Sequence, residues 1–575
     1  MRNFCYLIEK KLKTLPYNNL PDFNNLFLDY IDDFDKIKSY YKYDYRDDNE
    51  FLNALIKKKN TYLKESDFTR DDLCRVLTTQ NKFFNSTEKT YENIELLKSS
   101  NTFAIVTGQQ VGMLSGPLYT ILKALNAVQL ANKLNQKFKD YNFVPVFWLE
   151  CEDHDFLEIN NINLLTKENE VKNIAYFGVE GEQEKYIKPT GTIILDEKIE
   201  DFKNEIRSNL VETDFTNTVF DYINRSYKVG IDLKTSFARL LNYFLKDEGL
   251  IFMDPSEKDL KRPLTSIFKK ELSTYPALCE KVIISSAEME HEYDPVIKPK
   301  PINLFYTHNG NRYLIEPKDS ENFALKNSRQ KFSRDEMFLM LNANPELFSP
   351  NVLLRPVCQD TILPTVAYVG GPSEVAYFAQ IKDAYDFYDT PMPVIYPRTS
   401  ITVIEKRVEI FLEKNKLKIL DLFHPKDTAR RMVEKFSEMN IEELFTSYID
   451  ELNGVFYQFK QKLESIDKNL VNTLDKKDQQ YKDSINMLKD KFMTSYLNQN
   501  EIVTKQLNKI LSVIFPDNVL QERSLNIIYF LNKYGMDFIQ QLKDNINIEK
   551  FEHQFIETNF DAAPVKIEAV KENVE

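Results

Sequence analysis

The chain has 575 residues, more than a single hydrophobic core can organise, so two to four domains are expected. Its apolar content of 42% excludes wholesale disorder, and its net charge of −13 argues against nucleic acid as the main partner. Five scattered cysteines without a CxxC pair indicate neither a disulfide framework nor a thiolate zinc site. No apolar run suits a membrane span or a signal peptide, so a cytoplasmic protein is expected.

The first three regions of the chain differ in composition and in the spacing of their apolar residues. Residues 1–100 mix aromatic and charged residues at helical spacing and are predicted to be mainly helical. Residues 101–257 carry short apolar runs typical of buried parallel strands, namely "FAIVTG", "FVPVFWL", "GTIILD" and "GLIFMDP". They are predicted to form the first half of an α/β core. Residues 258–350 are predicted to be an inserted connective segment, with a hairpin in "NLFYTHNGNRYLIEP".

The α/β texture resumes over 351–425, with strands expected in "ILPTVAYVGG" and "MPVIYPR". Residues 426–540 are predicted to be a helical coiled-coil region, because apolar residues recur there every seven positions. The seam consists of Leu452, Phe459 and Ile466 interleaved with Phe456, Leu463 and Leu470. It predicts a homodimer, with a hairpin turn near Lys477 as an option and a long helix packed on its own domain as the alternative. Residues 541–575 are expected to be a tail that packs or is partly disordered.

The stretch "TGQQVGMLSGPLYT", residues 107–120, holds three of the chain's 13 glycines. It lies between a predicted strand and a predicted helix whose first residue, Pro117, suits the first helical turn. Free N–H groups and the dipole at a helix start favour a phosphate or carboxylate. The loop is neither a P-loop nor GxGxxG, so a tight turn that needs positive φ stays the alternative. The candidate nucleotide- or substrate-binding residues here are Thr107, Gly108, Gln109, Gln110, Gly116 and Pro117.

A second stretch, "TVAYVGGPSEVAYFAQ", repeats this order of strand, glycines and helix. Its candidate binding residues are Gly370, Gly371 and Glu374. In a doubly wound sheet, ligands bind outside the carboxyl ends of the strands at the topological switch point. Two such loops, one from each half of the sheet, are where a nucleotide would be held.

A run of polar residues, "EDHD", directly follows the predicted strand "VPVFWL". His154 and the flanking Asp153 and Asp155 are candidate catalytic residues, because carboxylates orient a histidine and raise its pKa. Glu152 is a candidate binding residue. A metal site formed by His154 with Asp153 or Asp155, with Cys151 as an optional further ligand, is a weaker alternative, and a solvated acidic turn is another.

The last motif is "YPRTSIT", which follows the predicted strand "MPVIYP". Arg398 is a candidate for two-pronged contact with phosphate or carboxylate, with a structural ion pair as the alternative. Thr399 and Ser400 are candidates for nucleotide or substrate binding beside it. Arg355, in "LLRPVCQD", is a similar candidate.

Taken together, these motifs and the late "FPDNVLQERSLNIIYFLNKYG" resemble the BshC family, which is assigned to cysteine ligation in bacillithiol biosynthesis. The resemblance runs from about residue 100 to 540. It implies a Rossmann-like nucleotide-binding core, similar to that of class I aminoacyl-tRNA synthetases, with inserted connective segments and a C-terminal α-helical coiled coil that supports a dimer. It also implies a role, the joining of cysteine to the amine of glucosaminyl malate.

The implied chemistry is amide formation through an activated carboxylate, either an acyl-adenylate or an acyl-phosphate. We therefore expect ATP or another adenine nucleotide, with ADP as one candidate product and Mg²⁺ as a candidate ion. Two other interpretations stay open. The chain could be a coiled-coil scaffold whose core binds a nucleotide without ligase activity, or a nucleotidyltransferase that acts on another small molecule.

Overall fold

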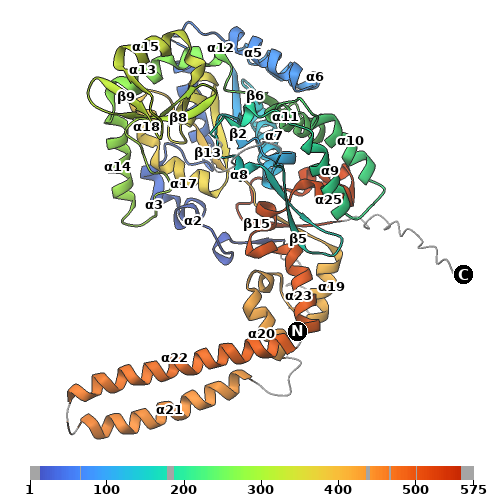
Figure 1. The fold of residues 1–575 in the computed structure, drawn as a ribbon, viewed down its shortest axis with the longest axis vertical. Helices are drawn as coiled ribbons and strands as arrows, with labels where there is room; N and C mark the ends of the chain where they lie inside the picture. The colour runs from blue at the N-terminus through green and yellow to red at the C-terminus, as the bar shows by residue number, and fades with distance from the viewer. Residues whose placement is uncertain are drawn as a thin grey trace, which may run out of the picture. The chain divides into compact units, whose positions relative to one another are not determined.

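The computed structural model describes residues 13–64, 66–177, 187–434, 441–464, 466, 468–499 and 501–558 (Figure 1). The chain forms two compact units, one made of Met1–Val403 with Gln521–Glu575 and the other of Ile404–Leu520. The second unit does not coincide with the helical region expected at 426–540, because the chain rejoins the first unit at Gln521. Across the described residues, no helix combines the length and apolarity needed to cross a bilayer.

The N-terminal region is helical over most of its described part, while residues 1–12 lie outside that part. Its elements are β1 (Thr14–Leu15), α2 (Asn25–Asp32), α3 (Phe34–Ile37), α4 (Asp48–Thr61), α5 (Arg70–Phe83) and α6 (Glu88–Leu96). Helix α5 begins where the sequence favours it, because Thr69 and Asp72 form a reciprocal capping box. Helices α4, α5 and α6 pack on strands of the central sheet.

Five parallel strands in the order β13-β12-β2-β3-β6 form the central sheet. The strands are β2 (Thr102–Gln110), β3 (Asn142–Glu150), β6 (Ile251–Met253), β12 (Thr365–Gly370) and β13 (Val394–Pro397). Nearly all their residues are buried, which explains the continuous apolar runs in the sequence. The parallel α/β sheet predicted from those runs is confirmed, and so is the Rossmann-like core that the family resemblance implied.

One predicted strand is wrong. "GTIILD" forms a 3₁₀ turn, η5 (Thr190–Thr192), followed by a single antiparallel bridge from Ile194 to Asp232. The side chain of Ile194 is 56% exposed, whereas those of the true core strands are buried. The elements around it are α8 (Phe156–Ile159), β4 (Asn161–Leu165), β5 (Val171–Ala175), α9 (Lys198–Asn209), α10 (Thr216–Ser226) and α11 (Leu233–Phe244).

The strand order places the topological switch point between β2 and β12. From β2 the chain proceeds to β3 and β6 on one side, and the later strands β12 and β13 lie on the other. Helix α7 (Tyr119–Lys137) follows β2, and α17 (Pro372–Gln380) follows β12. The two glycine-bearing loops therefore leave the carboxyl ends of adjacent strands, where such folds bind ligands.

The inserted segment carries its own antiparallel sheet, β10-β9-β8-β7-β11 (Figure 1). The predicted hairpin is present as β7 (Leu304–His308) and β8 (Asn311–Pro317), with positive φ at Asn309 and Gly310 as a tight turn requires. Further elements are α12 (Lys258–Lys261), α13 (Thr265–Thr274), α14 (Ala277–Met289), β9 (Asn322–Leu325), β10 (Lys331–Ser333), α15 (Arg334–Ala343) and β11 (Phe348–Pro350). Helices α16 (Arg355–Ile362) and α18 (Lys382–Phe387) belong to the second half of the core.

The second unit is helical, and its centre is an antiparallel hairpin of α21 (Ile441–Glu464) and α22 (Lys468–Gln499). Phe456 lies 5.9 Å from Tyr481 between ring centroids, and Lys460 forms an ion pair with Asp475 at 2.8 Å. The chain reverses direction between these helices, well before Lys477, so the predicted turn position is wrong. The other elements are β14 (Ile401–Ile404), at the junction of the units, α19 (Lys406–Asn415), α20 (Pro425–Glu434) and α23 (Glu501–Ile514).

The C-terminal segment returns to the first unit as α24 (Gln521–Ser524), α25 (Ile527–Tyr534), α26 (Asp537–Asn545) and β15 (His553–Glu557). Strand β15 lies between β1 and β14, so both ends of the chain share one small sheet. Of the tail expected at 541–575, the part up to residue 558 is thus folded, and residues 559–575 lie outside the described residues.

Candidate functional site

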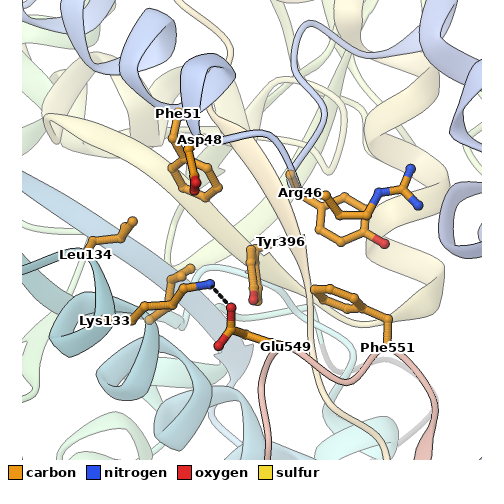
Figure 2. A pocket seen from close by; sticks show the side chains of 10 residues that line it. Arg46, Asp48, Phe51, Lys133, Leu134, Tyr396, Glu549 and Phe551 are labelled. Atoms are coloured by element: carbon orange, nitrogen blue, oxygen red, sulfur yellow. Dashed lines mark hydrogen bonds and ion pairs between the residues drawn. The ribbon is translucent and has the colours of Figure 1, made fainter. Parts of the chain in front are cut away.

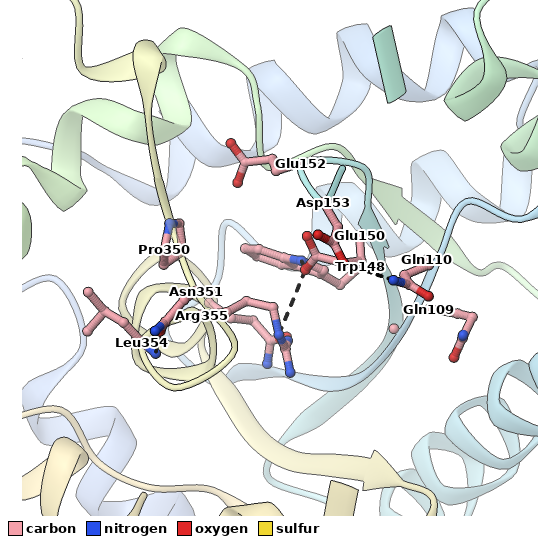
Figure 3. Close-up of polar contacts among 12 residues, drawn as sticks. Gln109, Gln110, Trp148, Glu150, Glu152, Asp153, Pro350, Asn351, Leu354 and Arg355 are labelled. Atoms are coloured by element: carbon pink, nitrogen blue, oxygen red, sulfur yellow. Dashed lines mark hydrogen bonds and ion pairs between the residues drawn. The ribbon is translucent and has the colours of Figure 1, made fainter. Parts of the chain in front are cut away.

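Polar side chains gather at the carboxyl edge of β2 and β3 (Figure 3). Gln110 and Glu150 end these strands as register partners. The Gln110 amide donates to Oδ2 of Asp153 at 2.9 Å, and Trp148 Nε1 donates to Glu150 at 3.3 Å. Gln110, Glu150 and Asp153 all keep partly exposed side chains, so this edge is accessible to a small molecule.

Arg355 reaches the same edge from the first turn of α16 (Figure 3). Its Nη2 donates to the Tyr377 hydroxyl at 2.6 Å and its Nη1 to Gln359 at 3.0 Å. Its Nε lies 3.8 Å from Oε2 of Glu150, which is too long for a direct hydrogen bond. Burial raises the pKa of the Glu150 carboxyl, and Arg355 opposes this shift. The arrangement leaves a cation and a carboxyl group side by side at the edge.

The members of the "EDHD" run have different partners. Glu152 is buried and pairs with Lys261 at 2.6 Å, which corrects its expected role as a binding residue. Asp155 accepts from the Glu158 N–H at 3.3 Å and caps the short helix α8, so its expected catalytic role also gives way to a structural one. Asp153 and His154 remain at the accessible edge and both contact Arg312.

His154 is half-buried beside Arg312, whose Nη1 lies 3.2 Å from Nδ1 of the imidazole. Burial and Arg312 lower the pKa of His154, and the neighbouring Asp153 and Asp155 only partly oppose them. The sequence predicted the reverse shift, because the two aspartates are adjacent in the chain whereas Arg312 comes from the inserted sheet. His154 is therefore neutral at physiological pH.

The metal alternative finds little support in the donor arrangement. Cys151 is buried, and its thiol donates to Asp254 at 3.2 Å instead of facing His154. Asp254 pairs with Lys234 at 2.5 Å. Within the described ranges, no group of three or more His, Cys, Asp or Glu side chains is placed to hold a metal ion.

The first glycine loop begins with close strand packing. A Cβ on Gly108 would lie 2.9 Å from the Trp148 carbonyl oxygen, so only glycine lets β2 approach β3 here. The Thr107 hydroxyl donates to the Val369 carbonyl at 2.9 Å and links β2 to β12. Lys123 of α7 donates to the Gly108 carbonyl at 2.9 Å and to Gln109 at 3.0 Å. Thr107 and Gly108 thus shape the sheet end, and the last two residues of β2, Gln109 and Gln110, are partly exposed at its edge.

The start of α7 is not a free anion-binding terminus. Gly116 has φ +67° and forms a tight turn, and its carbonyl accepts from the Asn526 side chain at 2.6 Å. Pro117 forms a bridge with Asn526, and the Leu118 N–H donates to the Leu525 carbonyl at 2.9 Å. The expected role of Gly116 and Pro117 in ligand binding is therefore corrected to that of turn residues, because the returning C-terminal segment occupies this position.

The second glycine loop is organised by Glu374. The Gly371 N–H donates to its Oε2 at 2.8 Å, the Tyr368 hydroxyl to its Oε1 at 2.6 Å, and Lys123 pairs with it at 2.5 Å. Burial would raise the pKa of Glu374, but Lys123 together with the hydrogen bonds from Tyr368 and Gly371 lowers it. The Gly370 carbonyl accepts from the Arg398 N–H at 2.7 Å. Lys123 and Glu374 thus tie the two glycine loops together across the switch point.

The two Nη nitrogens of Arg398 are engaged by Glu522 and are not available to a phosphate. Its side chain is almost fully buried, and its Nη1 and Nη2 donate to the two carboxylate oxygens of Glu522 at 3.0 and 2.7 Å. The Thr399 N–H donates to Asn126 at 2.7 Å, and the Ser400 hydroxyl donates to Glu522 at 3.0 Å. The structural ion pair, which was the alternative, is correct for Arg398, and Thr399 and Ser400 belong to the same interior network.

Sequence reasoning missed four residues, Lys123, Glu150, Arg312 and Glu522. Glu150 could have been found, because it ends the same predicted strand that the "EDHD" run follows. Lys123 lies within a helix that is otherwise mostly apolar, which marks a buried lysine as unusual. Arg312 and Glu522 carry no local signal, since their partners are distant in the chain.

Two family models match the chain, described as "Bacillithiol biosynthesis BshC, N-terminal Rossmann-like domain" over residues 11–399 and "Bacillithiol biosynthesis BshC, C-terminal coiled-coil domain" over residues 401–558. Relatives named "Putative cysteine ligase BshC" include those of Chloroherpeton thalassium, 36% identical over 94% of this chain and 99% of the relative, and Salinibacter ruber, 32% identical over 95% and 99%. The relative from Bacillus cytotoxicus is 29% identical over 89% and 94%. With a Rossmann-like sheet, a helical hairpin and matches over nearly its whole length, this chain belongs to the BshC family.

Proposed function

We propose that the carboxyl edge of the central sheet activates the carboxylate of cysteine with an adenine nucleotide and joins it to the amine of glucosaminyl malate in the cytoplasm. The observation that carries the proposal is the grouping of Arg355, Glu150 and Asp153 at the carboxyl edge of β2 and β3 (Figure 3). Family membership supports the ligase class, because the relatives are named as cysteine ligases.

Arg355 is our candidate for holding the reacting carboxylate. Its Nε is not within hydrogen-bond distance of Glu150, so this nitrogen can turn to an anionic ligand. Guanidinium groups match the planar geometry of carboxylates better than ammonium groups do. Tyr377 and Gln359 hold the other two nitrogens and fix the plane of the group.

The surroundings of the two glycine loops fit a nucleotide. Among the described residues, the buried Ser115 Oγ, Thr120 Oγ1 and Arg398 Nε have no hydrogen-bond partner. Arg398 Nε faces Gly371, and Thr120 Oγ1 faces Gly116, each within 4 Å of where a Cβ would stand. Unpaired buried polar atoms are costly, so we assign Arg398 Nε, beside Gly371, to a polar ligand, whereas the turn at Gly116 is closed by the C-terminal segment. A bound nucleotide would supply the leaving group that the carboxylate lacks. Mg²⁺ would bind together with the nucleotide, because proteins usually hold this ion by one or two carboxylates and the phosphates of the substrate.

The test is product formation by the purified protein with ATP, Mg²⁺, cysteine and glucosaminyl malate, followed by mass spectrometry. Nucleotide consumption that depends on both cysteine and the amine supports a ligase, and the nucleotide product distinguishes an acyl-adenylate from an acyl-phosphate. Nucleotide binding without consumption would support the scaffold, and consumption with another acceptor would support the nucleotidyltransferase.

Arg355→Lys should lower kcat/KM by about 10–100-fold, because hydrogen bonds to charged groups contribute about 1.5–3 kcal/mol. Arg334→Lys is the matched control, since Arg334 starts α15 and its side chain donates to the Ser273 carbonyl at 3.2 Å. Equal activity of both variants would remove Arg355 from the site.

We also propose a homodimer through the helical hairpin. Several large apolar side chains of α21 and α22 are more than half exposed in a single chain, among them Val455, Tyr457, Phe459 and Met487. Val455 and Phe459 are four residues apart and so lie on one face of α21, and exposed apolar side chains on one face mark an interaction site. A second copy suits it, because the heptad pattern of α21 is typical of helix pairing.

A further inference from the structure

The inserted sheet delivers one buried arginine to the end of β3. Arg312, on β8, is 6% exposed, and several contacts fix the position of its guanidinium group. Its Nε donates to Ser349 Oγ and its Nη2 to the Pro350 carbonyl, both at 3.0 Å, while its guanidinium lies 3.7 Å from the Phe305 ring centroid. Only Nη1 is left to face the "EDHD" run. The insertion therefore fixes the direction in which this nitrogen donates.

The direction in which Arg312 Nη1 donates determines which ring nitrogen of His154 carries the proton. Nη1 of Arg312 lies 3.2 Å from Nδ1 of His154, and a guanidinium can only donate. Nδ1 must then present its lone pair, so the proton of the neutral ring is on Nε2. Asp153 Oδ1 is 3.5 Å from the same nitrogen, but it already accepts from Arg312 at 3.3 Å and from the His154 backbone N–H at 2.8 Å.

The other ring nitrogen is available. Nε2 of His154 makes no hydrogen bond to any part of the chain that the structure describes, and the side chain is 33% exposed. Its nearest ring neighbour is Phe305, at 5.7 Å between centroids, which offers no acceptor in its plane. A substrate at the sheet edge would therefore meet an N–H group.

We propose that Arg312 is a positioning residue that holds His154 as a neutral imidazole protonated on Nε2, and so makes it a hydrogen-bond donor to the reacting carboxylate and not a base. The inference rests on the proposed function for the identity of that carboxylate. The tautomer itself depends only on the geometry of Arg312, Asp153 and His154.

The charges around the ring agree with this assignment. Arg312 and burial disfavour the imidazolium, Asp153 and Asp155 favour it, and the net effect lowers the pKa. A preorganised donor is worth most where negative charge increases in the transition state. No proton leaves His154 in this role, and its Nδ1 lone pair is already engaged, so the proton of the attacking amine passes to another acceptor.

The test is the tautomer of His154 in the intact protein, measured by long-range ¹H–¹⁵N correlation on a deuterated sample labelled with [¹⁵N]histidine. The chain has five histidines, so His154→Asn assigns the signal. At pH 7 we expect the pattern of protonated Nε2 and unprotonated Nδ1. A protonated Nδ1, or an imidazolium at pH 7, would falsify the proposal. This readout needs no ligase activity, so it is independent of whether the proposed function is correct.

Arg312→Gln tests the positioning role. The His154 signal should move toward a mixture of tautomers and its titration midpoint should rise, because a lowering charge is removed. Arg334→Gln, an arginine of the same inserted segment without a contact to His154, should leave both unchanged. An unaltered His154 signal in a folded Arg312→Gln protein would overturn the role. If that variant does not fold, the wild-type tautomer still decides whether Nδ1 is the acceptor.

Discussion

At the residue scale, the buried carboxylate of Glu522 accepts hydrogen bonds from three residues of the second half of the core. Both Nη nitrogens of Arg398, the Ser400 hydroxyl and the Ile401 N–H donate to it. Burial would raise its pKa, but Arg398, with smaller contributions from His553 and the Ile401 N–H, lowers the pKa of Glu522. A buried ion pair of this kind adds little over an apolar pair, yet it is costly to break from one side.

Arg398→Met should therefore lower the free energy of unfolding by about 3–5 kcal/mol, because Glu522 is left charged and buried. The double variant Arg398→Met with Glu522→Leu should recover a large part of that loss. Lys36→Met is the control, since Lys36 is 53% exposed in its pair with Asp29 and its loss should change the free energy of unfolding little. Urea unfolding measures all three. Equal losses in the single and double variants would contradict the ion-pair account.

His553 gives the fold a sensitivity to acid. It lies between the hydroxyls of Ser400 and Thr402, and burial lowers its pKa to about 4, while Glu522 opposes the shift and Arg398 adds to it. Below its ordinary pKa of 6.5 the unfolded chain binds a proton that the folded chain does not. The free energy of unfolding should fall as the pH drops from about 6.5 to 4, by on the order of 3 kcal/mol from this residue.

The measurement is urea unfolding at pH 7 and pH 4.5 for the wild type and for His553→Gln, which cannot titrate. The variant should lose less stability between the two pH values than the wild type does, and other titrating groups cancel in the comparison. An identical loss in both proteins would show that His553 does not cause it.

The residues of the candidate site were only partly predictable. The sequence located the correct strand ends, because polar residues after buried strands are visible locally, and Gln110, Asp153, His154 and Arg355 do lie at the accessible edge. It could not assign partners. Whether an arginine meets a ligand or a carboxylate depends on residues such as Glu522, and nothing in "YPRTSIT" announces it.

At the element scale, too, local patterns in the sequence predicted the elements, whereas what depends on distant parts of the chain was not predictable. Continuous apolar runs located five of the six expected strands, three before the insertion and two after it, because both faces of a parallel sheet are buried. "GTIILD" failed because one of its isoleucines, Ile194, is exposed and only bridges Asp232. The heptads identified α21, but the polar run at Lys477 lies within α22 and does not break it.

The exposed face of the hairpin leads to a prediction about assembly. Phe459→Glu should weaken the proposed dimer, because the Phe459 side chain is 51% exposed in a single chain and its charge would be buried at the interface. It suits the test better than Leu463, which is only partly exposed. Multi-angle light scattering gives the mass. Gln458→Glu, at an exposed neighbouring position, is the matched control for the added charge.

A monomer that unfolds at the wild-type temperature would locate the interface on this face. If Phe459→Glu keeps the mass of a dimer, this face is not the interface. The apolar seam then packs only within each chain, as in the alternative of a long helix packed on its own domain.

At the scale of the whole molecule, the first unit is discontinuous in sequence. Val403 and Gln521 are neighbours, since the Val403 N–H donates to the Gln521 side chain at 2.7 Å. A variant in which a short Gly-Ser linker replaces residues 404–520 should therefore fold and unfold cooperatively. A chain that stops after Val403 should not, because Arg398 and the start of α7 lose their partners Glu522 and Leu525. Circular dichroism during heating compares the two, and a cooperative transition of the truncated chain at the same temperature would contradict the prediction.

The return of the C-terminal segment also sets the order of events during protein synthesis. Glu522 is translated 124 residues after Arg398, which at about 5–20 residues per second is a delay of roughly 6–25 s. Throughout this interval the nascent chain has an arginine with no carboxylate to receive it and a glycine turn with no Asn526 to hold it. The central sheet, although made first, cannot reach its native state on the ribosome before the last helices emerge. A stop codon anywhere before Gln521 would consequently yield a product for proteases and not a shortened enzyme.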